Sequence, residues 1–249
     1  MRPAGPSKGT IVLVHLYPRE MSIYGDLGNT RCLAARIRRH GYDCVVHDHH
    51  PGAPFPEQAH LLMGGGGQDS GQSRVEDDLT VIGSRLHDLA DDGTPMVMIC
   101  GMFQIFGHAF VTSDGVELPG LGILDVTTRG QSERMIGPIV LDTDFGHVVG
   151  FENHSGATIL GPGQAPFGRV LTGHGNNRSD TSEGARHHNV IGSYLHGPIL
   201  PVNPRVADAL IAAAAERATG RPFEPAELDD TLADEARTRQ IRRLLTKRQ

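Results

Sequence analysis

The chain has 249 residues, of which 38% are hydrophobic, and a formal net charge of −6. This size suffices for one large α/β domain or two small ones, and a single domain over residues 1–249 is the simpler interpretation. No basic patch occurs outside the C-terminal end, which argues against nucleic acid as the principal partner. The three cysteines, Cys32, Cys44 and Cys100, are not closely spaced. They indicate neither a disulfide framework nor a zinc knuckle.

The sequence shows no sign of a targeting or membrane-spanning element. Residues 1–8 lack the apolar stretch of a secretory signal, and no window approaches the length of a membrane span. We therefore expect a cytoplasmic protein with no membrane span.

Strands and helices are predicted to alternate through the first part of the chain. Apolar runs predict strands at residues 10–16, 45–46, 60–63 and 96–99, and helical spacing predicts helices at 30–40 and 75–89. This alternation predicts an α/β fold with a doubly wound, mostly parallel sheet. In such folds ligands bind at the carboxyl ends of the strands.

The pattern changes after Phe110. Short β-like segments at 122–128, 135–141, 148–151 and 190–194 are separated by glycine-rich turns. They predict antiparallel or mixed strands added to the same domain. Helices are predicted at 204–218, with Pro204 at the start and Gly220 past the end, and at about 225–246. The domain core thus covers about 9–218, and a helical extension at about 221–249 carries a basic tail, interpreted as a solvated helix face.

Cys100 directly follows the predicted strand 96–99, and Gly101 and a helix start come next. A cysteine at such a turn lies at the carboxyl end of the sheet and near the positive end of a helix, which favours the thiolate. This is the arrangement of a nucleophile elbow. The alternative is a buried core cysteine, the commoner fate of a lone cysteine in an apolar run.

A cysteine nucleophile needs a base, and the 14 histidines supply many candidates. His196 is the best placed, because it follows the predicted strand 190–194 and so also lies at a strand end. Its alternative role is structural. The glycine run 64–67 leaves backbone N–H groups unshielded, so it can donate to an oxyanion or form a plain turn. The run lacks the lysine and Ser/Thr of a phosphate-binding loop, which gives nucleotide binding little support.

Arg134 and the histidine-rich run 47–50 can each be functional residues or ordinary surface residues. Arg134 precedes an apolar strand start and either clamps a substrate carboxylate or is an exposed surface arginine. The run His47-Asp48-His49-His50 has residue types that ligate zinc or iron. Successive side chains there point in different directions, and Pro51-Gly52 indicates a surface turn. We therefore predict no metal site.

Six elements between about residues 11 and 204 together resemble the class-I-type, cobyric-acid-synthase-like glutamine amidotransferases. They are Leu16-Tyr17-Pro18 with Tyr24-Gly25-Asp26-Leu27-Gly28-Asn29, Gly64-Gly65-Gly66-Gly67-Gln68-Asp69, Ile99-Cys100-Gly101-Met102-Phe103-Gln104, Gly150-Phe151-Glu152-Asn153-His154, Gly173-His174-Gly175-Asn176-Asn177 and Gly192-Ser193-Tyr194-Leu195-His196-Gly197-Pro198. The glycine run and the cysteine element mark the superfamily. The N-terminal loop and the last two elements resemble the GatD subgroup, the glutaminase subunits of lipid II isoglutaminyl synthase.

The resemblance implies a flavodoxin-like α/β fold and a role for each matching residue. Cys100 would attack the side-chain amide of L-glutamine to form a glutamyl thioester, and His196 would shuttle protons. Arg134 would hold the glutamine α-carboxylate. The implied substrate-binding set consists of Arg134, Gln104, Gly65, Gly66, Gly67 and Gly101, in which the glycines supply oxyanion donors.

The same resemblance implies a partner. Ammonia would pass to a Mur-ligase-like subunit, MurT, in a heterodimer, where an ATP-activated carboxylate of the peptidoglycan stem-peptide D-glutamate becomes D-isoglutamine. It implies no cofactor on this chain, with ATP and Mg²⁺ on the partner subunit.

Two positions depart from the pattern of many triad amidotransferases. Met102 stands where those enzymes carry glycine, and Pro198 stands where they carry the glutamate that orients the histidine. Cys100 and His196 then act as a dyad, or an acid comes from elsewhere. We hypothesise that the partner supplies this acid, because a glutaminase that is active alone wastes glutamine.

Two other functions are open. One is a glutaminase that feeds corrin-ring amidation, as in cobyric acid synthesis, or another ATP-dependent ligase; a fused synthetase domain would favour it, and 249 residues leave no room for one. The other is a catalytically inactive binding or regulatory module. The presence together of Cys100, His196, Arg134 and the glycine run argues against inactivity.

Overall fold

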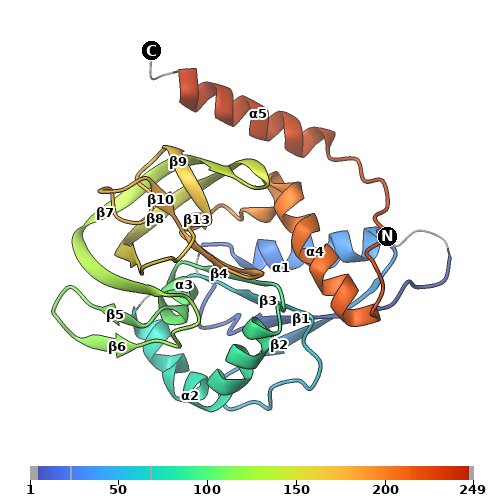
Figure 1. Ribbon diagram of the computed structural model, residues 1–249, viewed down its shortest axis with the longest axis horizontal. Coiled ribbons are helices and arrows are strands. Elements are labelled where there is room, and N and C mark those ends of the chain that lie inside the picture. The colour runs from blue at the N-terminus through green and yellow to red at the C-terminus, as the bar shows by residue number, and fades with distance from the viewer. Residues whose placement is uncertain (1–4, 23, 68, 247–249) are drawn as a thin grey trace.

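The computed structural model describes residues 5–22, 24–67 and 69–246, and no side chain of residues 69–73 is described. Two β-sheets lie side by side, with helices around the first (Figure 1). Sheet A contains β1 (Thr10–Leu16), β2 (Asp43–His49), β3 (Leu61–Gly64), β4 (Met96–Ile99), β11 (Ala185–His187) and β12 (Val190–Ser193). Its strand order is β11-β12-β4-β3-β1-β2, and only β11 runs antiparallel to its neighbour. The predicted doubly wound, mostly parallel sheet is confirmed.

Helices cover both faces of sheet A. On one side α1 (Leu27–Arg39) packs against α4 (Pro204–Thr219), and on the other lie α2 (Asp69–Asp91) and the short α3 (Gly101–Phe106) (Figure 1). All of β3 and β4 is buried between these layers, which explains why both segments are uniformly apolar. The helix predicted at 30–40 starts earlier, at Leu27, and the helix predicted at 75–89 is longer at both ends.

The strands after Phe110 form a second sheet. Sheet B contains β5 (Ala109–Val111), β6 (Glu117–Pro119), β7 (Val126–Thr143), β8 (Gly146–Leu160), β9 (Gly168–Thr172), β10 (Ser182–Glu183) and β13 (Leu195–His196). The segments predicted at 122–128 and 135–141 largely belong to one strand, β7, whose pairing with β8 shifts register between Gly130 and Met135. Polar residues between Gly130 and Met135 interrupt the apolar pattern, so the sequence predicts two strands where the structure has one.

The C-terminal part carries two helices after a short 3-10 turn, η1 (Leu200–Val202). Pro204 begins α4, and Gly220, with φ of 65°, ends it in the left-handed conformation that glycine adopts readily. The last helix, α5 (Thr231–Thr246), starts later than predicted, contains no buried residue and lies across sheet B (Figure 1). Of the basic tail, Lys247 and Arg248 lie outside the described residues. Among the helices described here, none has the length and apolarity needed to cross a membrane.

Candidate active site

The carboxyl ends of four parallel strands meet at one edge of sheet A. Leu16 of β1 pairs with Gly64 of β3, Gly64 pairs with Met98 of β4, and Ile99 of β4 pairs with Ser193 of β12. The chain leaves the sheet at this edge four times, and these exits carry the loop that precedes α1, the glycine run, Cys100 and the segment that ends at His196. The fold therefore brings together groups that are far apart in the sequence.

Cys100 occupies a strained turn between β4 and α3. Its φ of 53° and ψ of −106° lie outside the regions that non-glycine residues favour. Such a conformation costs on the order of 1–3 kcal/mol and persists only when its surroundings enforce it. Here the Cys100 N–H donates to the Ser193 carbonyl oxygen at 2.8 Å. The thiol does not cap α3, and the residue is 7% exposed. A core cysteine has no need of this backbone strain, whereas a nucleophile elbow is built on it.

His196 reaches the same place from sheet B. It pairs with Phe151 of β8, and its side chain is almost fully buried. A Cβ built on Gly66 would lie 3.0 Å from His196 Cε1 and 3.2 Å from Cys100 Cβ. The imidazole and the thiol thus flank the same glycine.

An acid that the sequence analysis did not assign faces His196. Asp26 is fully buried, and its Oδ1 lies 3.5 Å from His196 Nδ1. Asp26 stands at the N-cap of α1, where aspartate usually accepts a bond from the first helical turn. Its side chain makes no such bond, and Oδ2 instead accepts the Gly66 N–H at 2.7 Å. Asp26 therefore does not cap α1, and its carboxylate lies between the glycine run and the His196 imidazole.

The first turn of α1, directly after Asp26, contacts the segment after His196. A side chain at Gly28 would clash with the ring of Pro198, so this turn and the ring are in close contact. The Asn29 Oδ1 accepts the Leu200 N–H at 3.0 Å. Pro198 therefore packs against the first turn of α1, next to Asp26. Asp26 is therefore a candidate for the orienting acid within this chain, and the hypothesis that the partner supplies the acid stays a prediction.

Electrostatics at His196 favour the protonated imidazole. Burial lowers the pKa of His196, but the neighbouring Asp26 and Cys100 raise it by more, and the resulting pKa is about 9. The imidazole can therefore retain a proton taken from the thiol at neutral pH. The 3.5 Å between Asp26 Oδ1 and His196 Nδ1 is longer than an ordinary hydrogen bond, so the two groups interact mainly through their charges.

The glycine run is required for space. Cβ atoms on Gly65 and Gly66 would lie 2.9 Å from Asp26 Cβ and 3.2 Å from Asp26 Oδ2, respectively, and one on Gly67 would collide with Met21. The N–H of Gly66 already donates to Asp26 Oδ2, so it is not free to donate to an oxyanion as predicted. Gly65, Gly67 and Gly101 remain the predicted donors. Gln68, the next residue of this element, lies outside the described residues.

Arg134 lies in the irregular stretch of β7, on the exposed side of sheet B. Its guanidinium donates to Asn153 Oδ1 at 2.8 and 3.2 Å and to the Asn153 carbonyl oxygen at 3.2 Å. Asn153 is two residues along β8 from Phe151, the strand partner of His196. Gln104 is buried in α3, and its amide donates to the Tyr194 hydroxyl at 3.3 Å. This contact is one residue before β13, so Gln104 supports the segment that leads to His196; its contact with substrate stays a prediction.

One histidine of the histidine-rich run, His49, contacts a buried carboxylate. His49 is buried, and its Nε2 lies 2.8 Å from Asp78 Oδ2, which the Tyr17 hydroxyl also contacts at 2.6 Å. Within the described ranges, no three histidine, cysteine or acidic side chains are placed to hold a metal ion.

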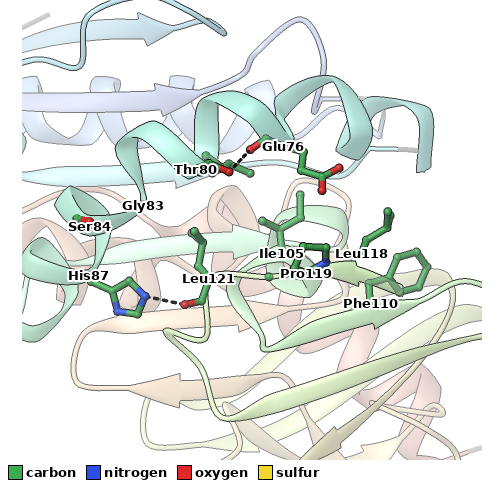
Figure 2. Close-up of a pocket in the computed structure, with 12 residues that line it drawn as sticks. Glu76, Thr80, Gly83, Ser84, His87, Ile105, Phe110, Leu118, Pro119 and Leu121 are labelled. Carbon is green, nitrogen blue, oxygen red and sulfur yellow. Dashed lines mark hydrogen bonds between the residues drawn. The ribbon is translucent and has the colours of Figure 1, made fainter. Parts of the chain in front are cut away.

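A pocket of about 280 Å³ lies away from these groups, between α2 and the β5–β6 hairpin (Figure 2). Leu79, Ile105 and Leu121 contribute apolar walls, and His87 closes one side through a bond from its ring to the Leu121 carbonyl oxygen at 2.6 Å. No predicted site residue lines it.

Comparison with known proteins identifies the family. Residues 12–204 match the CobB/CobQ-like glutamine amidotransferase domain. The chain belongs to this family. The family match covers the N-terminal loop, the glycine run, the Cys100 elbow and His196. The protein is therefore a glutamine amidotransferase, as the sequence elements indicated.

Two relatives in this family match almost the whole chain. The lipid II isoglutaminyl synthase (glutamine-hydrolyzing) subunit GatD of Staphylococcus aureus is 39% identical over 88% of this chain and 90% of its own length. The Streptococcus pneumoniae subunit of the same name is 35% identical over 90% and 87%. A probable cobyric acid synthase of Methanosphaera stadtmanae is 36% identical, but over 41% of this chain and 23% of its own length.

Solved structures of low sequence identity share the fold. A glutamine amidotransferase structure superimposes with a TM-score of 0.57 at 16% identity, covering 82% of this chain and 98% of the other. The PurLQS structure from Thermotoga maritima gives a TM-score of 0.52 at 14% identity, with coverages of 85% and 97%. These similarities support the fold of the glutamine amidotransferase family.

Of the residues at the site, Asp26 is the one that sequence reasoning missed. A signal was available, because Asp26 is the carboxylate within the 24–29 element and follows the first strand of the sheet. The loop after that strand leaves the same edge as Cys100, which makes its acidic residue a candidate partner for the base.

Proposed function

We propose that this chain is the glutamine-hydrolysing subunit of a lipid II isoglutaminyl synthase. It releases ammonia from L-glutamine for a Mur-ligase-like partner, MurT, which amidates the D-glutamate of the peptidoglycan stem peptide to D-isoglutamine. The observation that carries the proposal is the near full-length similarity to two subunits of that name, 39% and 35% identical, in a chain whose Cys100 and His196 converge. No cofactor is assigned to this chain, and ATP and Mg²⁺ belong to the partner. The complex works in the cytoplasm, where free thiols and ATP are available.

The chemistry follows from the two converging side chains. The Cys100 sulfur attacks the side-chain amide carbon of glutamine while His196 accepts the thiol proton. His196 returns this proton to the leaving nitrogen, the C–N bond breaks, and ammonia departs from a glutamyl thioester. Water then attacks the thioester with His196 as base, which releases glutamate and restores the thiol. The amides of Gly101 and of Gly65 or Gly67 stabilise the oxyanion that forms in each step.

Asp26 acts on this reaction through His196. A carboxylate against Nδ1 fixes the imidazole tautomer and orientation, so that Nε2 can exchange protons with the thiol and the leaving amine. Because Asp26 belongs to this chain, the proposed site is chemically complete without the ligase, and the ligase contributes the ammonia acceptor.

Arg134 is assigned to the glutamine α-carboxylate. Its exposed guanidinium forms a planar fork close to the β8 strand that pairs with His196. Replacing Arg134 with alanine is expected to raise KM for glutamine about 10- to 100-fold with a smaller change in kcat, since charge-assisted bonds contribute about 1.5–3 kcal/mol. Steady-state glutamate release measures both constants. Arg169→Ala, which removes an exposed arginine paired with Asp142 in the same sheet, is the control with unchanged KM. An unaltered KM in Arg134→Ala would remove this assignment.

The proposed function is tested by reconstitution with the Mur-ligase-like subunit. With ATP, Mg²⁺ and a stem-peptide substrate, amidation from glutamine should require this chain, whereas amidation from added ammonium chloride should not. A corrin substrate offered with its own synthetase serves as the competing acceptor. Amidation of the corrin and not of D-glutamate would replace the proposal with the cobyric acid alternative.

A further inference from the structure

The chain crosses from sheet A to sheet B at Tyr194. Ser193 is the last residue of β12 and Leu195 is the first residue of β13. This corner lies between the two reactive groups, because the Ser193 carbonyl oxygen accepts the Cys100 N–H at 2.8 Å and His196 follows directly after Leu195. Any shift of the corner changes where the imidazole stands relative to the elbow.

A fully buried carboxyl group, that of Glu183, holds this corner. Glu183 Oε1 accepts the Tyr194 N–H at 2.7 Å, and the Ser193 hydroxyl donates to Oε1 at 3.1 Å and Oε2 at 3.2 Å. The Ser193 hydroxyl oxygen in turn accepts the Leu195 N–H at 3.1 Å. One side chain thus satisfies the Tyr194 amide directly and the Leu195 amide through Ser193. Leaving a buried amide without a partner is costly, so these bonds are a strong constraint on the corner.

The backbone that carries the Glu183 side chain is fixed by strand pairing and by hydrogen bonds. Glu183 pairs with Gly168 in the β9–β10 ladder. The next residue, Gly184, has φ of 63° and is held at both ends by Asn176, whose Oδ1 accepts its N–H at 2.8 Å and whose Nδ2 donates to its carbonyl oxygen at 2.9 Å. A side chain at Gly184 would collide with the Gly192 carbonyl oxygen of β12. The backbone that presents Glu183 therefore lies tightly against the strand whose end it fixes.

The other side of the corner is fixed by the Tyr194 side chain. Its hydroxyl is hydrogen-bonded to Thr158 Oγ1 at 2.7 Å, and its ring stacks on His154 with centroids 3.6 Å apart. The side chain of Tyr194 is therefore held by Thr158 and His154, and its backbone N–H is held by the Glu183 carboxyl group.

We propose that Glu183 is a positioning residue that sets the distance and orientation of His196 relative to Cys100. It touches neither the substrate nor the reacting atoms and acts through the hydrogen bonds of Ser193 and Tyr194. The inference rests on the proposed roles of Cys100 and His196.

The protonation of Glu183 indicates the matched replacement. Burial raises the pKa of Glu183, bonds from Tyr194 and Ser193 lower it, nearby Glu152 raises it and His196 lowers it, with a result of about 8. A carboxyl group that keeps its proton near neutral pH resembles a glutamine side chain, which has the same shape and the same acceptor oxygen. Alanine removes the bonds, whereas glutamine keeps the Oε1 acceptor for the Tyr194 N–H and the Ser193 hydroxyl.

The full-length chain with Glu183→Ala or Glu183→Gln tests the inference through glutaminase kinetics. Because a displacement of about 1 Å costs on the order of 100-fold in rate, Glu183→Ala should lose about 10- to 100-fold in kcat with little change in KM. Glu183→Gln should recover most of that loss. The control for loss of stability alone is Asp208→Ala, which removes a carboxylate bonded to Arg36 at 2.7 Å, far from the corner, and should lower the melting temperature without this loss of kcat.

The second readout is the pH dependence of Cys100 alkylation by iodoacetamide, with the labelled cysteine identified by mass spectrometry. In Glu183→Ala the profile should move toward that of an isolated thiol, because the imidazole no longer stands against the sulfur. An unchanged profile and unchanged kcat in a folded Glu183→Ala would overturn the inference while leaving the proposed function standing. Full activity in both Cys100→Ala and His196→Ala would instead overturn the site on which it rests.

Discussion

Replacing Cys100 with alanine is expected to reduce glutamine hydrolysis by at least about 1,000-fold, because a covalent mechanism without its nucleophile retains only binding and oxyanion stabilisation. The fold should survive. Alanine tolerates the φ of 53° no worse than cysteine does, and the residue removed is small. Glutamate release measured enzymatically gives the rate, and circular dichroism with thermal unfolding checks the fold.

The other cysteines provide the control for this prediction. Burial raises the pKa of both Cys32 and Cys44 to about 11, so each remains a thiol at neutral pH. Cys32→Ala and Cys44→Ala should hydrolyse glutamine at the rate of the unaltered protein. If Cys100→Ala kept the full rate, or if Cys44→Ala lost it, the nucleophile would have been wrongly assigned.

Replacing Asp26 with asparagine is expected to lower kcat about 100-fold or more. The amide keeps the shape of the side chain and can still accept the Gly66 N–H through Oδ1. It no longer offers a carboxylate to His196 Nδ1. The Nδ1–H tautomer of the imidazole is then no longer favoured and the imidazolium is no longer stabilised, and proton exchange depends on both. Asp78→Asn is the matched control, because Asp78 is also a buried carboxylate with protein donors but is bonded to Tyr17 and His49 rather than to His196.

The same substitution separates the two sources of the orienting acid. If Asp26 orients His196, the chain should hydrolyse glutamine at a similar rate with and without the ligase partner, and Asp26→Asn should be impaired in both states. Turnover that appears only with the partner and does not respond to Asp26→Asn would restore the hypothesis of an acid from the partner subunit.

The Asp26 variant should also change the pH dependence in a defined direction. The folded protein raises the pKa of His196 from 6.5 to about 9, against burial and through Asp26 and Cys100. The stabilisation from the charged imidazole is therefore fully present below about pH 6.5 and is lost as the pH rises through about 9. In Asp26→Asn the His196 pKa falls, so the alkaline limb of the kcat–pH profile should move to lower pH.

The stability of Asp26→Asn should depend on pH in the same sense. The loss of unfolding free energy, measured by denaturant titration, should be larger at pH 6.5 than above pH 9. Equal losses at both pH values would show that Asp26 does not interact with the charged imidazole.

The sequence by itself determined the elements whose signals are local. The apolar runs of β1 and β4 predicted both strands with the bounds that the structure shows, because strands buried on both faces are mostly apolar. Pro204 and Gly220 marked the ends of α4, since each acts through its own backbone conformation. The elbow at Cys100 was visible for the same reason, as strand, cysteine and helix start are contiguous.

Tertiary structure decided what depends on contacts between distant segments. The long strands β7 and β8 were divided or shortened in the prediction, because their polar stretches are stabilised by pairing with each other and not by local propensity. Asp26 and His196 are 170 positions apart and meet only because β1 and β12 end at the same edge of sheet A. The Glu183 contact with the Tyr194 corner likewise needs both sheets in place. A sequence pattern displays the residue types that a site requires, whereas the distances among a carboxylate, an imidazole and a thiol follow from the register of the strands that carry them.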